Sequence, residues 1–291
     1  MAQLATYTQP RHAGLKIHRI KYMKPFHSLI ALATAAILIS SAIAADAPPP
    51  AVSATDLATR LTELQQDGSS YVRLKLEVQQ PGTAKVALQL QIKQRRTKTA
   101  TDVVYQVLWP KERKGESVLL HKAANQPATG TLFIPPDSLR SLAAADMKEP
   151  LFGSDLTYAD ILENFFAWEH QTITGTEIVD RVNCQILESK PGKSQRSPYA
   201  SVRTWVDARR LIPLRVEKYS ASGQLALRMD TTSVATDDKR RPIPANLSVR
   251  SRKDSSTELD GSRIKHDVNY GDHEFTPEGL KEMAVPRTAP E

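Results

Sequence analysis

Residues 71–94 read YVRLKLEVQQPGTAKVALQLQIKQ, and this stretch decides the fold class. Apolar side chains occupy every second position on both sides of Pro81-Gly82, so each half has one apolar face and one polar face. Proline followed by glycine is typical of a turn between strands. The stretch therefore predicts a β-hairpin, and the side chains that face its core include Val72, Leu74, Leu76, Leu88 and Leu90.

The same alternation continues along much of the chain. Three strands are expected at residues 101–110, 115–123 and 129–136, and seven more follow a central interruption. Each candidate strand ends at glycine, proline or a charged cluster, as hairpin-connected strands do. The spacing predicts a mainly β (α+β) protein whose antiparallel sheet curls into a barrel. Together with the family resemblance described below, we expect an incomplete antiparallel β-barrel of about 11 strands.

The start of the chain has the features of an export signal. A basic residue, Lys24, precedes the apolar run 29–39, and Ala42-Ile43-Ala44 fits the small-residue rule for cleavage. We interpret residues 1–44 as a signal peptide cleaved near Ala44. We expect translation to start at Met23, so that residues 1–22 are not part of the protein made in the cell. An uncleaved membrane anchor is the alternative, although a span needs about 20 apolar residues.

This interpretation places the mature chain in the periplasm. Residues 45–54 are expected to form a linker and residues 55–291 a single domain. The leader holds five basic residues and no acidic one, so the formal net charge of +7 falls to +2 after cleavage. A nucleic-acid partner is therefore not expected. The one cysteine, Cys184, excludes an intramolecular disulfide and is expected to be a small core residue.

Residues 153–162, GSDLTYADIL, interrupt the alternation with signals for a helix. Thr157 and Asp160 stand at the spacing of a capping box, and Leu156 and Ile161 at that of a hydrophobic staple. The helix is predicted from Tyr158 to about residue 167. Its wide apolar face is on a helix too short to be stable alone, so it must lie against other apolar surface.

Helical signals also cover residues 135–147, so a helical lid is expected over about 136–167. Two interpretations remain open: a plug that fills the barrel permanently, or a lid over a cavity for an apolar ligand. In either case the predicted lining is Val72, Leu74, Leu76, Leu88, Leu90 and Trp109 from the sheet, with Leu156, Ile161, Phe165 and Phe166 from the lid. Two further helices are expected, at residues 55–68 with Thr55 as cap and from Pro277 with Thr276 as cap.

The sequence resembles the LolA-like outer membrane lipoprotein-sorting proteins of Gram-negative bacteria. The matching residues, in order, are Leu108-Trp109-Pro110-Lys111, Leu151-Phe152-Gly153-Ser154-Asp155-Leu156-Thr157-Tyr158-Ala159-Asp160-Ile161, Gly175-Thr176-Glu177-Ile178-Val179-Asp180, Cys184, Leu187-Glu188, Trp205-Val206-Asp207, Ile212-Pro213-Leu214, Tyr219 and His273-Glu274-Phe275-Thr276. Most of the resemblance lies between Leu108 and Tyr219, and it rests on the order and spacing of the pieces.

The resemblance implies a half-barrel with a helical lid and a hydrophobic cavity. It implies a periplasmic carrier that binds lipoprotein or lipid acyl chains without a cofactor. We expect the protein to be a monomer. An inner-membrane donor transporter and an outer-membrane acceptor are implied as partners. The chain departs from the family in two places. Residues 181–183 stand where a turn glycine is expected, and the sequence does not place an equivalent of the family's lid-locking arginine.

Two other classes of function are alternatives to a carrier, namely an enzyme and a sensor. No HExxH, GxSxG or P-loop spacing is present, and the one acid–base cluster, Asp272-His273-Glu274, is interpreted as a surface turn. The sequence therefore predicts no enzyme, with neither catalytic nor metal-binding residues. The alternative is a periplasmic lipid-binding sensor that regulates a membrane partner.

Overall fold

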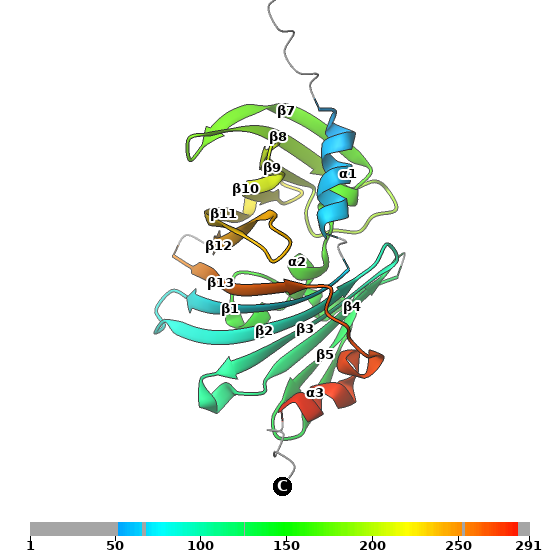
Figure 1. Cartoon of the computed structure of the whole chain (residues 1–291), viewed down its shortest axis with the longest axis vertical. Helices are drawn as coiled ribbons and strands as arrows, with labels where there is room; N and C mark the ends of the chain where they lie inside the picture. Colours follow the sequence, from blue (N-terminus) through cyan, green and yellow to red (C-terminus); the bar gives the residue numbers. More distant parts are fainter. Residues whose placement is uncertain (1–51, 66–67, 125, 252–253, 285–291) are drawn as a thin grey trace, which may run out of the picture. The chain divides into compact units, whose positions relative to one another are not determined.

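The computed structural model describes residues 52–65, 68–124, 126–251 and 254–284. The predicted signal peptide, its cleavage position and most of the predicted linker lie outside these residues. One antiparallel sheet of thirteen strands has the order β6-β5-β4-β3-β2-β1-β13-β12-β11-β10-β9-β8-β7 (Figure 1). The strands are β1 (Ser69–Gln79), β2 (Val86–Arg96), β3 (Ala100–Trp109), β4 (Ser117–Ala123), β5 (Thr129–Ile134), β6 (Ser138–Leu142), β7 (His170–Val179), β8 (Val182–Lys190), β9 (Ser201–Asp207), β10 (Ile212–Tyr219), β11 (Leu225–Thr236), β12 (Pro242–Arg250) and β13 (Ser256–His266).

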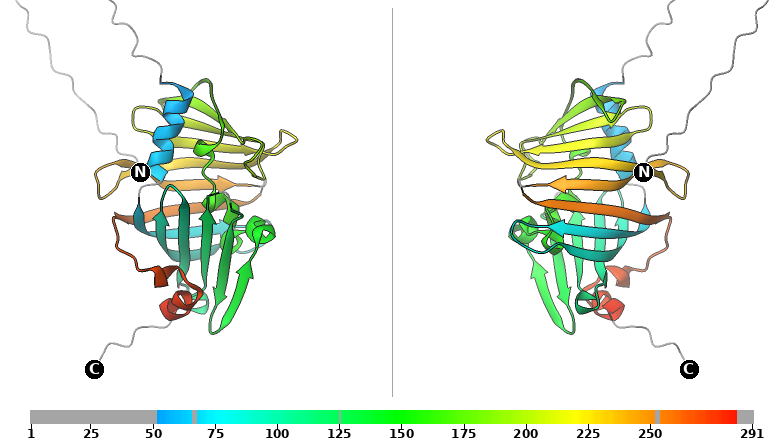
Figure 2. Two further views of the ribbon diagram at one scale, coloured as in Figure 1. Left: turned by 90° about the vertical axis from the view of Figure 1, so that its right-hand side faces the viewer. Right: turned by 90° about the vertical axis from the view of Figure 1, so that its left-hand side faces the viewer.

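The hairpin predicted from residues 71–94 is confirmed. β1 pairs with β2 so that Leu74 lies opposite Leu90 and Leu76 opposite Leu88. Gly82 supplies the left-handed backbone of the turn, with φ of 72°. Within the described residues the edge strands β6 and β7 do not pair with each other. The sheet is therefore an incomplete barrel, as predicted, with slightly more strands than the expected eleven (Figure 2).

The helices are α1 (Ala54–Gln65), α2 (Tyr158–Leu162) and α3 (Pro277–Ala284), with short 3-10 turns η1 (Lys111–Arg113), η2 (Ala144–Lys148), η3 (Leu151–Gly153), η4 (Phe165–Ala167) and η5 (Asp272–Phe275). We call the sheet face that carries Leu76 and Leu88 the inner face, and its opposite the outer face. Residues 143–169, here named the central segment, join β6 to β7 and pack with α1 on the inner face. α3 packs on the outer face.

The predicted cap of α1 was wrong. Ser53 rather than Thr55 caps the helix, because its Oγ accepts a hydrogen bond from the backbone N–H of Asp56 at 3.0 Å. Leu57 and Leu61 of α1 are buried, whereas Leu64 is 41% exposed near the end of the helix.

The helix predicted within residues 135–147 was wrong in its first half. Residues 138–142 form the edge strand β6, in which Leu139 lies opposite Phe133 of β5. Pairing with an available strand satisfies backbone groups that a single isolated helical turn would leave open. Only the 3-10 turn η2 remains of that helix, so helical structure begins at Ala144. The predicted helix from Tyr158 is also divided, since α2 ends at Leu162 and η4 starts at Phe165.

The β7–β8 turn accommodates the missing glycine. Asp180 and Arg181 have φ of 47° and 67°, the left-handed conformation that glycine adopts most easily. Aspartate tolerates this region better than most residues, and the strands on both sides remain paired up to Val179 and Val182. The departure from the family pattern therefore leaves the hairpin intact.

α3 begins as predicted and attaches to the outer face. Thr276 Oγ1 accepts a hydrogen bond from the backbone N–H of Gly279 at 3.1 Å. Leu280 is fully buried against Val104, Leu119 and Phe133. The end of the described chain therefore packs on strands from its first half.

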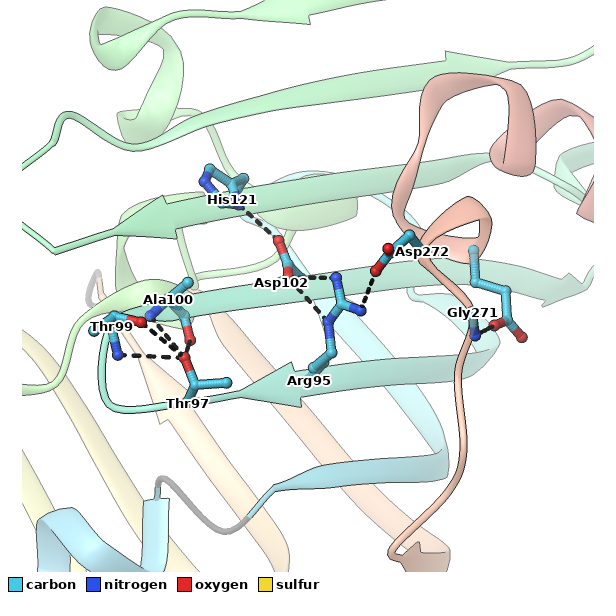
Figure 3. Close-up of polar contacts among 9 residues, drawn as sticks. Arg95, Thr97, Thr99, Ala100, Asp102, His121, Gly271 and Asp272 are labelled. Carbon is cyan, nitrogen blue, oxygen red and sulfur yellow. Dashed lines mark hydrogen bonds and ion pairs between the residues drawn. The ribbon is translucent and has the colours of Figure 1, made fainter.

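Charged side chains continue this attachment (Figure 3). Arg95 of β2 donates to Asp272 of η5 at 2.7 Å and to Asp102 of β3 at 3.1 Å. Asp102 also lies 2.6 Å from Nδ1 of His121 on β4. These four side chains link three neighbouring strands to η5. They lie on the outer face, so they are separated from the predicted lining.

Candidate functional site

The predicted wall residues form most of one apolar cluster on the inner face. Leu76, Leu88 and Leu90 are at most 1% exposed and pack with the half-buried Leu74. Val72 is half-buried and lies opposite Ile92 and Ile264, outside that cluster.

Trp109 lies apart from the other predicted wall residues. It is the last residue of β3, where the strand ends before Pro110, and its side chain is 52% exposed. It belongs to none of the hydrophobic clusters in the described part of the chain.

The central segment covers this wall and the strands beside it. Phe152 packs against the wall cluster. Leu151, Tyr158 and Leu162 pack against a neighbouring group that the sheet contributes, formed by Val118, Leu120 and Leu142. The first half of the segment is therefore held over β1 to β6 by apolar contacts.

The four predicted lid residues are packed on the inner face at two separate places. Leu156 is buried with Leu227 and Val249, and Ile161 packs against the same group. Phe165 and Phe166 lie further along the sheet, where their cluster includes α1 residues and strands β8 to β10. The capping box and the staple are confirmed, but the four residues do not share one continuous helical face.

A buried carboxylate links the segment to the end of β12 and the start of β13. Asp155 is 6% exposed, and its Oδ1 accepts hydrogen bonds from the hydroxyls of Ser251 and Ser255, both at 2.5 Å. Thr257 donates to Oδ2 at 2.8 Å and accepts from the backbone N–H of Asp155 at 2.8 Å. These donors replace the water that the carboxylate loses on burial.

A second polar group joins α2 to β10. Lys218 is 2% exposed on the inner face, and its Nζ lies 2.6 Å from Asp160 Oδ1 and 3.5 Å from Glu163 Oε2. Tyr199 donates to the same Asp160 oxygen at 2.9 Å. Ser197 donates to Glu163 Oε1 at 2.5 Å. One buried cation therefore faces two carboxylates.

The two carboxyls respond differently to this environment. Burial acts against ionisation of Asp160, but the Lys218 charge and the Thr157 hydrogen bonds together hold its pKa below the usual range. Burial raises the pKa of Glu163, and the neighbouring Asp160 charge raises it further. The Lys218 charge and the Ser197 hydrogen bond lower this pKa, but they do not offset the first two effects. Ionised Glu163 is therefore the less favourable of the two charges.

Replacing Glu163 with glutamine is expected to raise the melting temperature at pH 8 by about 2–4 °C. Because the pKa of Glu163 is raised in the folded protein, its carboxyl stabilises the fold fully below the unfolded pKa of 4.5. This stabilisation is lost as pH rises through the folded-state pKa. Glutamine does not titrate, so the difference between the proteins should shrink toward pH 4.5. Calorimetric melts across this range check it, and a variant less stable than wild type at pH 8 would contradict it.

A third polar contact involves a residue that the sequence analysis missed. Arg96 lies at the end of β2, and its Nη2 donates to the backbone carbonyl of Ile161 at 3.1 Å. Burial lowers the pKa of Arg96, and its buried Nε makes no hydrogen bond within the described residues. Arg96 therefore attaches the central segment to the end of β2 through a backbone carbonyl.

The alternation pattern contained a signal for both missed cations. Arg96 continues the inward-facing series of Leu88, Leu90 and Ile92, and Lys218 follows the inward-facing Val216 in the same way. A charged residue at an inward position requires a buried partner. For both residues that partner lies on the central segment.

A different group in the described residues has ligand types suited to a metal. Ligand atoms of Asp237, Asp238 and His266 lie within 4.8 Å of one another. Arg241, however, donates to Asp237 at 2.9 Å and places Nη2 3.1 Å from His266 Nε2. Its positive charge opposes a cation there, and the arrangement is that of an ion-paired turn between β11 and β12.

The Asp272-His273-Glu274 cluster lies at the surface, as interpreted, and forms the 3-10 turn η5. The Asp272 side chain is 93% exposed, and His273 Nε2 lies 2.9 Å from Glu282.

None of the helices in the described ranges is long and apolar enough to cross a membrane.

Comparisons with known proteins agree on the fold. A family model described as "uncharacterized protein" matches residues 99–282, well over half of the chain. A search of curated proteins gave no match. A DUF1329 family protein from Desulfovibrio piger superposes with a TM-score of 0.71 at 21% identity, over 78% of this chain and 97% of that one.

Two further solved structures carry names from lipoprotein sorting. An outer membrane lipoprotein-sorting protein domain from Vibrio parahaemolyticus has a TM-score of 0.70 at 17% identity, over 78% of this chain and 98% of that one. A LolA superfamily protein from Nitrosomonas europaea has a TM-score of 0.62 at 20% identity, over 79% and 100%. This chain therefore belongs to the family described as uncharacterized protein, and it has the fold of the LolA-like outer membrane lipoprotein-sorting proteins.

Proposed function

We propose that this protein is a periplasmic carrier that binds lipid or lipoprotein acyl chains on its inner face and moves them toward the outer membrane. The observation that carries the proposal is the attachment of the central segment. The segment adds no strand to the sheet and covers apolar side chains. Besides apolar packing, it is held by polar contacts of Asp155, Asp160, Glu163 and Ile161. Such a segment acts as a lid whose release uncovers the wall.

The energetics of acyl chains suit this surface. Each CH₂ group removed from water contributes about 0.8 kcal/mol, so chains bind an apolar wall without specific polar contacts. The segment's own apolar side chains make equivalent contacts in the closed arrangement, so cargo and lid compete for the same surface. The proposed contact residues are Val72, Leu74, Leu76, Leu88, Leu90, Trp109, Leu156, Ile161, Phe165 and Phe166.

The wider setting follows from the family likeness. We place the protein in the periplasm after cleavage near Ala44, with residues 55–291 acting as one domain and as a monomer. An inner-membrane transporter would deliver the cargo and an outer-membrane component would accept it. The protein supplies surface rather than chemistry, in keeping with the structural pairing of its buried charged groups.

The proposal predicts bound lipid in protein purified from periplasm without detergent. Organic extracts of the mature chain should contain lipid or acylated peptide in about equimolar amount, as measured by mass spectrometry. Transfer of that cargo from one membrane to another would support the carrier. Bound lipid without transfer would favour the sensor, and a protein that stays empty after incubation with membranes would contradict both.

A matched pair of variants tests the wall directly. Leu74→Glu places a charge on the inner face, and Gln89→Glu places the same charge at an exposed position of the neighbouring strand. Leu74→Glu is expected to lose most of the bound lipid because a carboxylate in an apolar site must be desolvated. Gln89→Glu should retain it. Melting curves of both variants establish that the fold is kept.

A further inference from the structure

Lys218 is an unusual residue for its position. It lies on the inner face of β10, where its register partners Leu227 and Val202 are both fully or nearly fully buried. Its ammonium lies over the rings of Tyr199, at 4.8 Å, and Phe165, at 5.7 Å. A buried ion pair is often no more stabilising than apolar side chains of similar volume. A lysine kept here therefore calls for a reason beyond stability.

The donors and acceptors around Lys218 are divided between two parts of the protein. Lys218 comes from β10, and Tyr199 and Ser197 come from the connection between β8 and β9. All three donate, and both acceptors, Asp160 and Glu163, belong to the central segment. Release of the segment would remove both carboxylates together. It would leave an ammonium and two hydroxyls on the sheet side without their acceptors.

An apolar path leads from this donor group to the predicted wall. Leu227, the register partner of Lys218, packs with Val249. Leu259 packs against that pair and also against the wall cluster. The path crosses four strand spacings from β10 to β1, about 19 Å at the usual separation. An acyl chain spans one leaflet, about 15 Å, so it could lie along this path.

We propose that Lys218, Tyr199 and Ser197 bind the phosphate of an anionic amphiphile whose acyl chains lie along the inner face. In the closed arrangement Asp160 and Glu163 occupy the place of that phosphate. This inference rests on the proposed carrier function and specifies its cargo class. An ammonium with two hydroxyl donors suits a phosphate, which offers several acceptor oxygens and a negative charge. A neutral lipid would leave the three donors unsatisfied.

The test measures affinity for short-chain lipids dispersed as monomers, so that no membrane competes. Dioctanoylphosphatidylglycerol and dioctanoylglycerol carry the same chains and differ in the phosphate headgroup. Calorimetric titration of the mature chain should give about tenfold tighter binding of the phosphate lipid, as charged hydrogen bonds contribute to affinity. Glycerol phosphate is titrated separately, because it carries the headgroup without chains.

Two variants separate the roles of the sheet and the segment. The pair Asp160→Asn and Glu163→Gln removes the competing charges, so the phosphate lipid should bind more tightly than to wild type. Adding Lys218→Met to this pair removes the cation without leaving buried carboxylates unpaired. The triple variant should lose the preference for phosphate and keep its affinity for dioctanoylglycerol.

The outcomes distinguish this inference from the carrier proposal. Equal binding of both lipids by wild type, or an unchanged preference in the triple variant, would overturn the headgroup site and leave the carrier standing. Binding of neither lipid would count against the carrier and therefore against this inference too. Glycerol phosphate binding as tightly as the phosphate lipid would overturn the amphiphile and assign the site to free phosphate.

Discussion

Replacing Lys218 with methionine is expected to lower the free energy of unfolding by about 3–5 kcal/mol at pH 7. The loss arises because Asp160 and Glu163 would remain as buried carboxylates without their cation. Urea denaturation of the wild type and the variant measures it. The triple variant with Asp160→Asn and Glu163→Gln should recover most of the loss, since neutral side chains need no partner charge.

Lys75→Met is the matched control for this prediction. Lys75 is also a lysine on a strand and pairs with Glu77 at 2.5 Å, but its side chain is 51% exposed. Exposed pairs contribute about 0–1 kcal/mol, so this variant should be nearly as stable as wild type. Equal effects of the two lysine substitutions would contradict a special role for the buried pair.

A disulfide between the central segment and the sheet is expected to abolish lipid loading. The contact of the Asp155 backbone N–H with Thr257 Oγ1 at 2.8 Å places the two Cα atoms within about 7 Å, near the upper end of the disulfide range. Asp155→Cys with Thr257→Cys should therefore cross-link when oxidised. If cargo enters only after the segment leaves the sheet, the oxidised protein stays empty, as mass spectrometry of extracts would measure.

Reduction provides the internal control, because the same protein should load lipid again once the bond is broken. Each single cysteine variant controls for the lost polar contacts of Asp155 and Thr257. Cys184 is fully buried and does not interfere. Full loading of the oxidised protein would contradict the lid, because acyl chains would then bind while the segment stays in place. A protein that stays empty in both the oxidised and the reduced state would indicate a permanent plug.

The features that the sequence predicted correctly depend on neighbouring residues. Alternation in β1 and β2 and the capping box of Thr157 and Asp160 are contained within a few positions, so local propensity determines them. The edge strand β6 is different. Its five residues carry no decisive local pattern, and their structure is set by the neighbouring strand β5.

The polar contacts of the central segment could not be predicted for a related reason. Asp155 meets Ser251, and Asp160 meets Lys218, across separations of 96 and 58 residues. A single sequence gives the chemical type of each partner but not which distant residue it will meet. The inward-facing positions of Lys218 and Arg96 in the alternation pattern predict only that each residue has a buried partner. Trp109 shows the same limit, since a register shift between β2 and β3 places it opposite the exposed Gln89 rather than among the inward-facing residues.

The pairing of β1 with β13 has a consequence for how the chain folds. Val72 lies opposite Ile264, so strands from the two ends of the domain meet near the middle of the sheet. Until residues 256–266 have been synthesised, β1 and β12 have no strand to join them, and α3 cannot yet dock on the outer face. Contacts between such distant residues form slowly, because the long loop must close before they contribute. The arrangement keeps the growing chain open until its last strand is available.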